Sequence, residues 1–142
     1  MRHFSNEEKG FIRDPDPSPA ARNCFLWRYE AAWTLFWALG YVQALGIPRR
    51  ACDVEFAVSC KRDRNTDKFA AESALRPIHQ ILDQADLIFR YHWAGVDAAL
   101  AKRAVPAGLN GGIVYERHHA LRWLIGYQDW DDVAIDIENS VG

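Results

Sequence analysis

One stretch in the first third of the chain restricts the fold more than any other. Between residues 21 and 45, apolar side chains recur at helical spacing on two faces. One face carries Trp27, Ala31, Thr34, Ala38, Tyr41 and Leu45, and the other carries Leu26, Tyr29, Trp33, Phe36 and Gly40. A helix that is apolar nearly all round is buried on most sides. The sequence therefore predicts a central helix over residues 21–45, ended by Gly46-Ile47-Pro48.

Two further segments have a helical period. A second long helix is predicted to begin near Phe69 or Pro77 and to run to residue 101, and a third covers residues 113–125 with Gly126 as its C-cap. Shorter helices are predicted over residues 6–12, after a capping box, and over 54–60, capped by Asp53. Residues 61–67 and 106–112 have loop and turn composition, and no segment alternates like a strand.

These elements predict an all-α fold, a compact irregular bundle of three long helices plus short helices. The length of 142 residues fits one domain. We expect residues 1–19 to form a short helix and a proline-rich linker, residues 20–136 the core, and residues 137–142 a tail.

Composition excludes several classes of protein. The net charge is −2 and Lys and Arg occur only in short runs, which argues against a nucleic-acid partner. The apolar stretch over residues 31–42 is too short to span a bilayer, so we expect no membrane partner. The N-terminus lacks the apolar segment of a secretory signal, and the 3 Cys residues form no Cys-x-x-Cys motif. A cytoplasmic protein with reduced thiols, no metal and no cofactor is expected.

The second long helix places ionisable side chains on one face, at spacings of three, four and seven: His79, Asp83, Asp86, Arg90 and Asp97. Two interpretations remain open. Side chains three and four apart project together and suit a divalent metal. The favoured alternative is a solvated face with an Asp86–Arg90 ion pair.

The third helix carries one Glu-x-x-His, formed by Glu116 and His119. Carboxylate-bridged di-iron sites need two such motifs, and the chain has no second, so we reject that site. His118 lies on the apolar stripe of this helix, where a hydrogen-bonded core histidine is more common than a ligand. His92, on the seam of the second helix, is the best candidate for a shifted pKa. Burial would lower this pKa and a neighbouring carboxylate would raise it, and the direction stays open.

Two charges, Arg28 and Glu30, fall in the aromatic start of the central helix. Burying a charge is costly unless it is paired. The candidate partners from neighbouring helices are Asp83, Asp86, Arg90, Glu116 and Arg117. Such a network either fixes how the helices dock or forms the floor of a polar pocket.

Several blocks of residues, in this order, resemble one known family. The blocks are Trp27-Arg28-Tyr29-Glu30, Phe36-Trp37-Ala38-Leu39-Gly40, Cys52-Asp53-Val54, Leu75-Arg76, Ile81-Leu82-Asp83-Gln84-Ala85-Asp86-Leu87, Phe89-Arg90-Tyr91-His92-Trp93-Ala94, Glu116-Arg117-His118-His119-Ala120-Leu121, Trp123-Leu124 and Trp130-Asp131-Asp132-Val133. The order closely resembles bacterial proteins grouped as domain-of-unknown-function family 4272, over residues 4–136. The resemblance implies no reaction. Family members commonly carry further N-terminal sequence, so the resemblance implies either a short member or a helix supplied by another chain, and the latter favours self-association.

Two functions remain, and no catalytic residue is assigned. The favoured one is a non-enzymatic interaction or accessory module with a protein partner or self-association, because no nucleophile–base motif is present. The alternative is a small-ligand binder or enzyme whose site lies between the helices. Its candidate ligand-binding residues are Arg28, Glu30, Asp83, Asp86, Arg90, His92, Glu116 and Arg117.

Overall fold

Helices make up all the regular structure in the part of the chain that the structure describes. The structure is a computed structural model, and it describes residues 6, 13–16, 18–126 and 129–133. The elements are α2 (Pro19–Ala38), α3 (Val54–Arg62), α4 (Thr66–Glu72), α5 (Ile78–Leu100), the short 3₁₀ helix η1 (Pro106–Gly108), α6 (Gly111–Ile125) and η2 (Trp130–Asp132). The all-α prediction is confirmed, while the helix predicted over residues 6–12 falls almost wholly outside the described residues.

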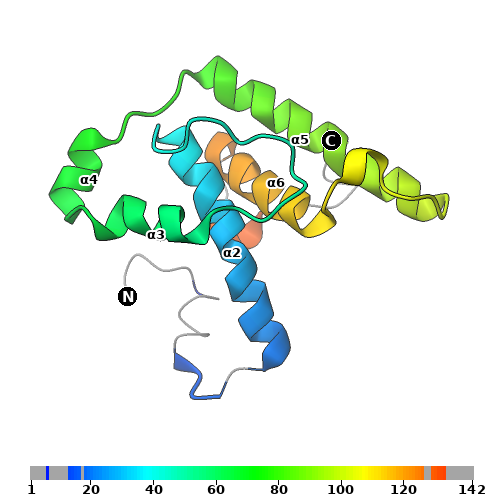
Figure 1. The fold of residues 1–142 in the computed structure, drawn as a ribbon, viewed down its shortest axis with the longest axis horizontal. Coiled ribbons are helices and arrows are strands. Elements are labelled where there is room, and N and C mark those ends of the chain that lie inside the picture. The colour runs from blue at the N-terminus through cyan, green and yellow to red at the C-terminus, as the bar shows by residue number, and fades with distance from the viewer. Residues whose placement is uncertain (1–5, 7–12, 17, 127–128, 134–142) are drawn as a thin grey trace.

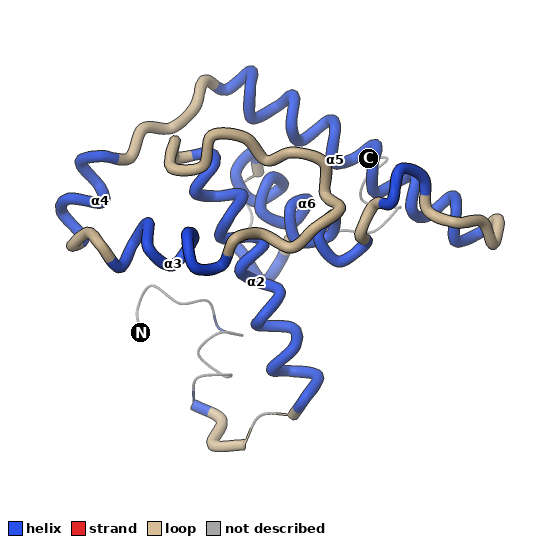
Figure 2. Tube along the Cα trace, in the orientation of Figure 1, coloured by secondary structure: helices blue, strands red, loops and turns tan. Residues whose placement is uncertain are grey.

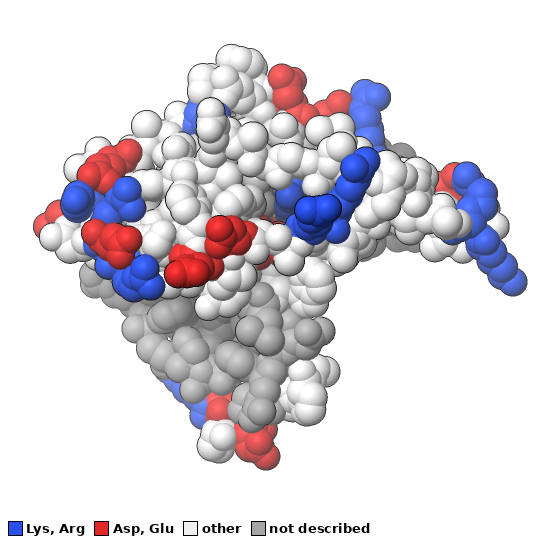
Figure 3. Space-filling model, in the orientation of Figure 1, with Lys and Arg blue, Asp and Glu red and all other residues white. Residues whose placement is uncertain are grey.

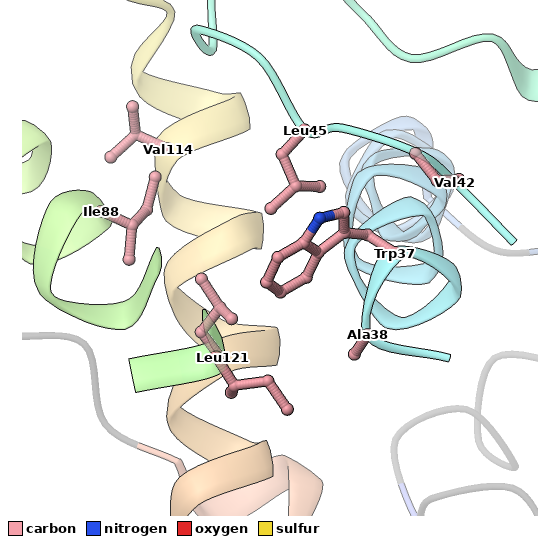
Figure 4. Packing of buried hydrophobic residues seen from close by; sticks show 8 residues of the cluster. Trp37, Ala38, Val42, Leu45, Ile88, Val114 and Leu121 are labelled. Carbon is pink, nitrogen blue, oxygen red and sulfur yellow. The ribbon is translucent and has the colours of Figure 1, made fainter. Parts of the chain in front are cut away.

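Helix α6 lies between the other two long helices, packing against α2 on one side and α5 on the other (Figure 1). The sequence predicted a central helix over residues 21–45, but α6 occupies the central position. Figure 4 shows the Trp37 indole of α2 reaching from that helix towards α6, where Val114 and Leu121 lie, with Ile88 of α5 beyond. This three-helix contact forms the main hydrophobic core.

Helix α2 ends at Ala38, seven residues before the predicted end at residue 45. Gly40 adopts φ +93, and the Tyr41 N–H donates to the Phe36 carbonyl at 2.8 Å. A glycine in the left-handed region followed by this bond is a common helix ending. The prediction was wrong because Gly40 was counted as part of a helical face. A long loop, residues 39–53, follows and crosses in front of α6 (Figure 2).

The segment between α3 and α5 holds a helix that the sequence analysis missed. Residues 61–67 were predicted as a loop, but α3 continues to Arg62 and α4 begins at Thr66. The Asn65 side chain caps α4 by accepting from the Lys68 N–H at 2.7 Å. Asp53 caps α3 as predicted, accepting from the Phe56 N–H at 3.0 Å. The later of the two predicted starts of the second long helix is confirmed, because α5 begins just after Pro77.

Two further features of the described helices concern their hydropathy and their charge. None of them is long and apolar enough to cross a membrane. On the face drawn in Figure 3, acidic and basic side chains are interspersed over α3 and α4 rather than gathered by sign. Ion pairs of Glu72 with Arg64 and Lys68 account for part of this mixing.

Candidate functional site

The predicted ligand-binding residues separate into three places. Arg28, Glu30, Glu116 and Arg117 belong to the α2–α6 interface, where the last three are buried. Asp83, Asp86 and Arg90 lie on the exposed face of α5, and His92 lies where α5 meets α6. The structure therefore brings together the α2 and α6 charges but not those of α5.

The buried charges of the α2–α6 interface hold the loop of residues 39–53. Glu30 is 3% exposed, and its Oε1 accepts from the Cys52 N–H at 2.7 Å. Arg117 is 5% exposed and donates to the carbonyls of Leu45 at 2.9 Å and Gly46 at 2.7 Å. One charged side chain from each helix thus forms hydrogen bonds with backbone groups of the loop, which lacks the regular hydrogen bonds of a helix or a sheet.

Burial shifts the pKa values of several ionisable side chains at this interface. It raises the pKa of Glu116, an effect that nearby Arg28 partly opposes and Glu30 increases. Burial also lowers the pKa of Arg117, and Glu30 opposes that change. The pKa of the Cys52 thiol is raised to about 12, first by burial and then by Glu30. A thiol with this pKa stays protonated at neutral pH, so Cys52 is a poor nucleophile.

The exposed face of α5 matches the solvated-face interpretation. Arg90 Nε donates to Asp86 Oδ2 at 3.0 Å, with the two side chains 73% and 61% exposed. Within the described ranges, no three His, Cys, Asp or Glu side chains lie close enough to hold a metal ion. An exposed ion pair of this kind contributes little to stability.

Two histidines from different helices meet at the α5–α6 seam. The imidazole of His92 lies 5.2 Å from that of His118 between ring centroids, and Phe89 flanks His118 at 6.3 Å. His118 is 1% exposed, as expected for a core histidine. However, His118 Nδ1 and His92 Nε2 are buried and have no hydrogen-bond partner among the described residues. Each therefore carries a desolvation cost that a further binding partner would relieve.

Both imidazoles are held in the neutral form. Burial lowers the pKa of His118 to about 4, and electrostatic interactions with His92 and Arg122 act in the same direction. Burial alone lowers the pKa of His92. The sequence singled out His92 for a pKa shift and placed His118 in the core. It did not reveal their contact, which depends on how α5 packs on α6.

A cavity opens on each side of this histidine pair. The α5–α6 chamber, on the His92 side, has a volume of about 290 Å³. Its lining consists of Tyr91, His92, Gly95, Val96, Ala99, Val105, Leu109, Gly111, Val114 and Tyr115. The His118 groove has a volume of about 280 Å³ and is lined by Leu82, Ala85, Asp86, Phe89, His118, Arg122 and Ile125. The end of α5 and the start of α6 line the chamber, whereas the start of α5 and the end of α6 line the groove. The two helices therefore run antiparallel.

The remaining histidine of α6 belongs to neither cavity. His119 stacks on Trp130 of η2 at 4.4 Å between ring centroids, and its Nε2 lies 2.7 Å from the Trp130 carbonyl oxygen. His119 therefore helps to fix the segment that follows α6.

Comparison with known proteins gives a family but no activity. No curated protein and no solved structure shows a significant match to the chain. Residues 1–133 match the family described as domain of unknown function (DUF4272). The match covers almost the whole sequence and agrees with the resemblance of its ordered blocks, so the chain belongs to the DUF4272 family.

Proposed function

We propose that this domain is a non-enzymatic accessory module that binds a small, largely apolar molecule in the α5–α6 chamber. The observation that carries the proposal is the combination of an apolar cavity with one polar group that lacks a partner, His92. Ligand sites typically combine apolar walls with a few polar groups that orient the ligand.

The walls and size of the chamber define the ligand. Val96, Val105, Leu109 and Val114 supply aliphatic surface from both helices and from the connection between them. The volume of about 290 Å³ suits a molecule of the size of a substituted benzene ring rather than a nucleotide. Apolar contact would supply most of the binding free energy.

The polar part of the chamber selects for one hydrogen-bonding group. The His92 imidazole is neutral because burial lowers its pKa, so it offers both a donor and an acceptor nitrogen. A hydroxyl on the ligand suits such a group, whereas a full charge would be poorly solvated among the aliphatic walls.

The lining also favours binding over catalysis. It contains no carboxylate and no cysteine to pair with His92. The Cys52 thiol, with its raised pKa, stays protonated at neutral pH and does not line the chamber. Holding a ligand, rather than transforming it, fits this set of groups.

The test uses phenol and toluene, two probes of similar volume that differ in one hydroxyl. NMR titration of the intact chain is expected to show saturable binding of both, with phenol about fivefold tighter because of one hydrogen bond. In a His92→Phe variant, both probes should still bind, and the preference for phenol should disappear. Absence of saturable binding by either probe in the wild-type chain would overturn the proposal.

A blocked variant shows whether the probes occupy the chamber. A Cβ added at Gly95 meets nothing within 4 Å, so Gly95→Leu should extend into the chamber without disturbing the helix. This variant is expected to lose binding of both probes. The matched control is Asp83→Leu, on the exposed face of the same helix, which should bind like the wild type. Equal binding by the Gly95→Leu and wild-type chains would place the probes elsewhere and reject the chamber.

A further inference from the structure

The His118 groove lies on the other side of the histidine pair and differs in chemistry from the chamber. We propose that this groove is a second site, which binds a small organic anion through Arg122 and His118, with an apolar body against Phe89. It goes beyond the proposed function, because both the cavity and the class of ligand are different.

Arg122 brings a positive charge that the described residues leave unneutralised. It lines the groove, and it makes no ion pair or hydrogen bond to any described residue. Its charge reaches the site, since it is one of the causes that lower the pKa of His118. A partly buried guanidinium that has no ion-pair partner would be stabilised by a bound anion.

His118 supplies an independent indication of a ligand. It is 1% exposed and lines the groove, yet its Nδ1 has no partner among the described residues. The neutral imidazole can donate one hydrogen bond to an oxygen of the anion, next to the guanidinium. The two donors lie four residues apart on one face of α6, and both line the groove.

The apolar wall indicates an organic anion rather than an inorganic one. Leu82 and Ile125 remain 48% and 39% exposed beside the groove, and Phe89 lies deeper, against His118. A carboxylate attached to a ring or a short chain would cover these side chains, whereas phosphate or sulfate would leave them in water.

One carboxylate, Asp86, lines the groove and would repel an anion. Its charge is balanced, however, because Arg90 Nε donates to Asp86 Oδ2 at 3.0 Å. Arg122 also lies in the last turn of α6, where a positive charge interacts favourably with the helix dipole. That role explains a cation at this position but not the unpartnered imidazole beside it.

The experiment compares benzoate with its neutral analogue benzamide, by calorimetry on the intact chain at low salt. Benzoate is expected to bind at least tenfold tighter, because charge-assisted hydrogen bonds are the stronger ones. Arg122→Gln should abolish this preference, and Arg122→Lys should restore part of it. Asp86→Asn should strengthen benzoate binding, since it removes the one negative charge in the lining. The control is Arg103→Gln, at an arginine that pairs with Asp97 just beyond the C-terminal end of α5, and it should leave binding unchanged.

Each outcome decides the proposal. Equal affinity for benzoate and benzamide, no binding of benzoate, or benzoate binding that survives Arg122→Gln would each overturn it. The Gly95→Leu variant separates the two sites, because it should lose phenol and keep benzoate. If benzoate does not bind, the proposal for the chamber is unaffected. If phenol does not bind, the proposal for the groove is unaffected.

Discussion

The buried side chains of Glu30 and Arg117 form hydrogen bonds with backbone groups of the loop of residues 39–53. Sequence reasoning identified Arg28 and Glu30 as charges that need partners, because they fall among aromatic residues. It included Arg117 and Glu116 among the candidates, and these two do lie with them. It could not show that Glu30 and Arg117 bond mainly to backbone groups of Cys52, Leu45 and Gly46, because loops have no periodicity from which to place them.

Replacing Arg117 should strongly destabilise the protein. Arg117→Met removes both bonds to the loop carbonyls and leaves the Glu30 carboxylate buried without the nearby cation. The expected loss in the free energy of unfolding is about 3–5 kcal/mol, measured by urea denaturation. Arg90→Met, in an exposed ion pair, should cost at most about 1 kcal/mol. Similar losses for the two variants would show that Arg117 is not a buried anchor.

His118 makes stability depend on pH in a defined direction. Its pKa falls from 6.5 to about 4 on folding, through burial and electrostatic interactions with His92, Arg122 and His119. Between these values the unfolded chain binds a proton that the native state does not, so stability falls as the pH is lowered through this range. The loss from His118 alone reaches about 3 kcal/mol at most. Glu116, whose pKa is raised, acts in the opposite direction, so the comparison must be between variants.

The measurement is urea unfolding of the wild type and of His118→Asn at several pH values. The wild type is expected to lose more stability on acidification than the variant does. If the two curves run parallel, His118 does not titrate differently in the native and unfolded states.

The starts of α3 and α5 followed the sequence, because a cap or a proline was recognised before each of them. These residues are Asp53 and Pro77, respectively. The end of α2 was missed because Gly40 fits the helical period and also permits φ +93, and only the tertiary fold decides between the two. The start of α4 depends on Asn65, whose polar surroundings resemble a loop.

The contact between α2 and α6 should tolerate a methyl group at one glycine and not at its neighbour. A Cβ on Gly112 would lie 3.0–3.2 Å from atoms of the Trp27 ring, whereas a Cβ on Gly111 meets nothing within 4 Å. Gly112→Ala should therefore cost about 1–3 kcal/mol of stability through overpacking. Gly111→Ala should be neutral or stabilising, by at most about 1 kcal/mol. Thermal unfolding of this matched pair checks the α2–α6 packing, and equal effects would contradict it.

The whole molecule shows why fold class was easier to predict than the site. Apolar periodicity and the absence of strand patterns were sufficient to predict an all-α bundle. The histidine pair and its two cavities arise from the antiparallel packing of α5 on α6. No local pattern encodes that arrangement, because His92 and His118 lie in separate helices. The exposed charges Asp83, Asp86 and Arg90 share a face of α5, whereas Glu30 of α2 is buried.

The central claim is that the α5–α6 chamber is a ligand site, and crystallography with 4-iodophenol tests it most directly. The anomalous signal of iodine locates the probe without assumptions about its pose. We expect an iodine peak among Val96, Val105 and Val114, with the hydroxyl within hydrogen-bond distance of the His92 imidazole. The peak should be absent in Gly95→Leu crystals soaked in the same way. An empty chamber in the wild type, with iodine only at other positions, would contradict the account.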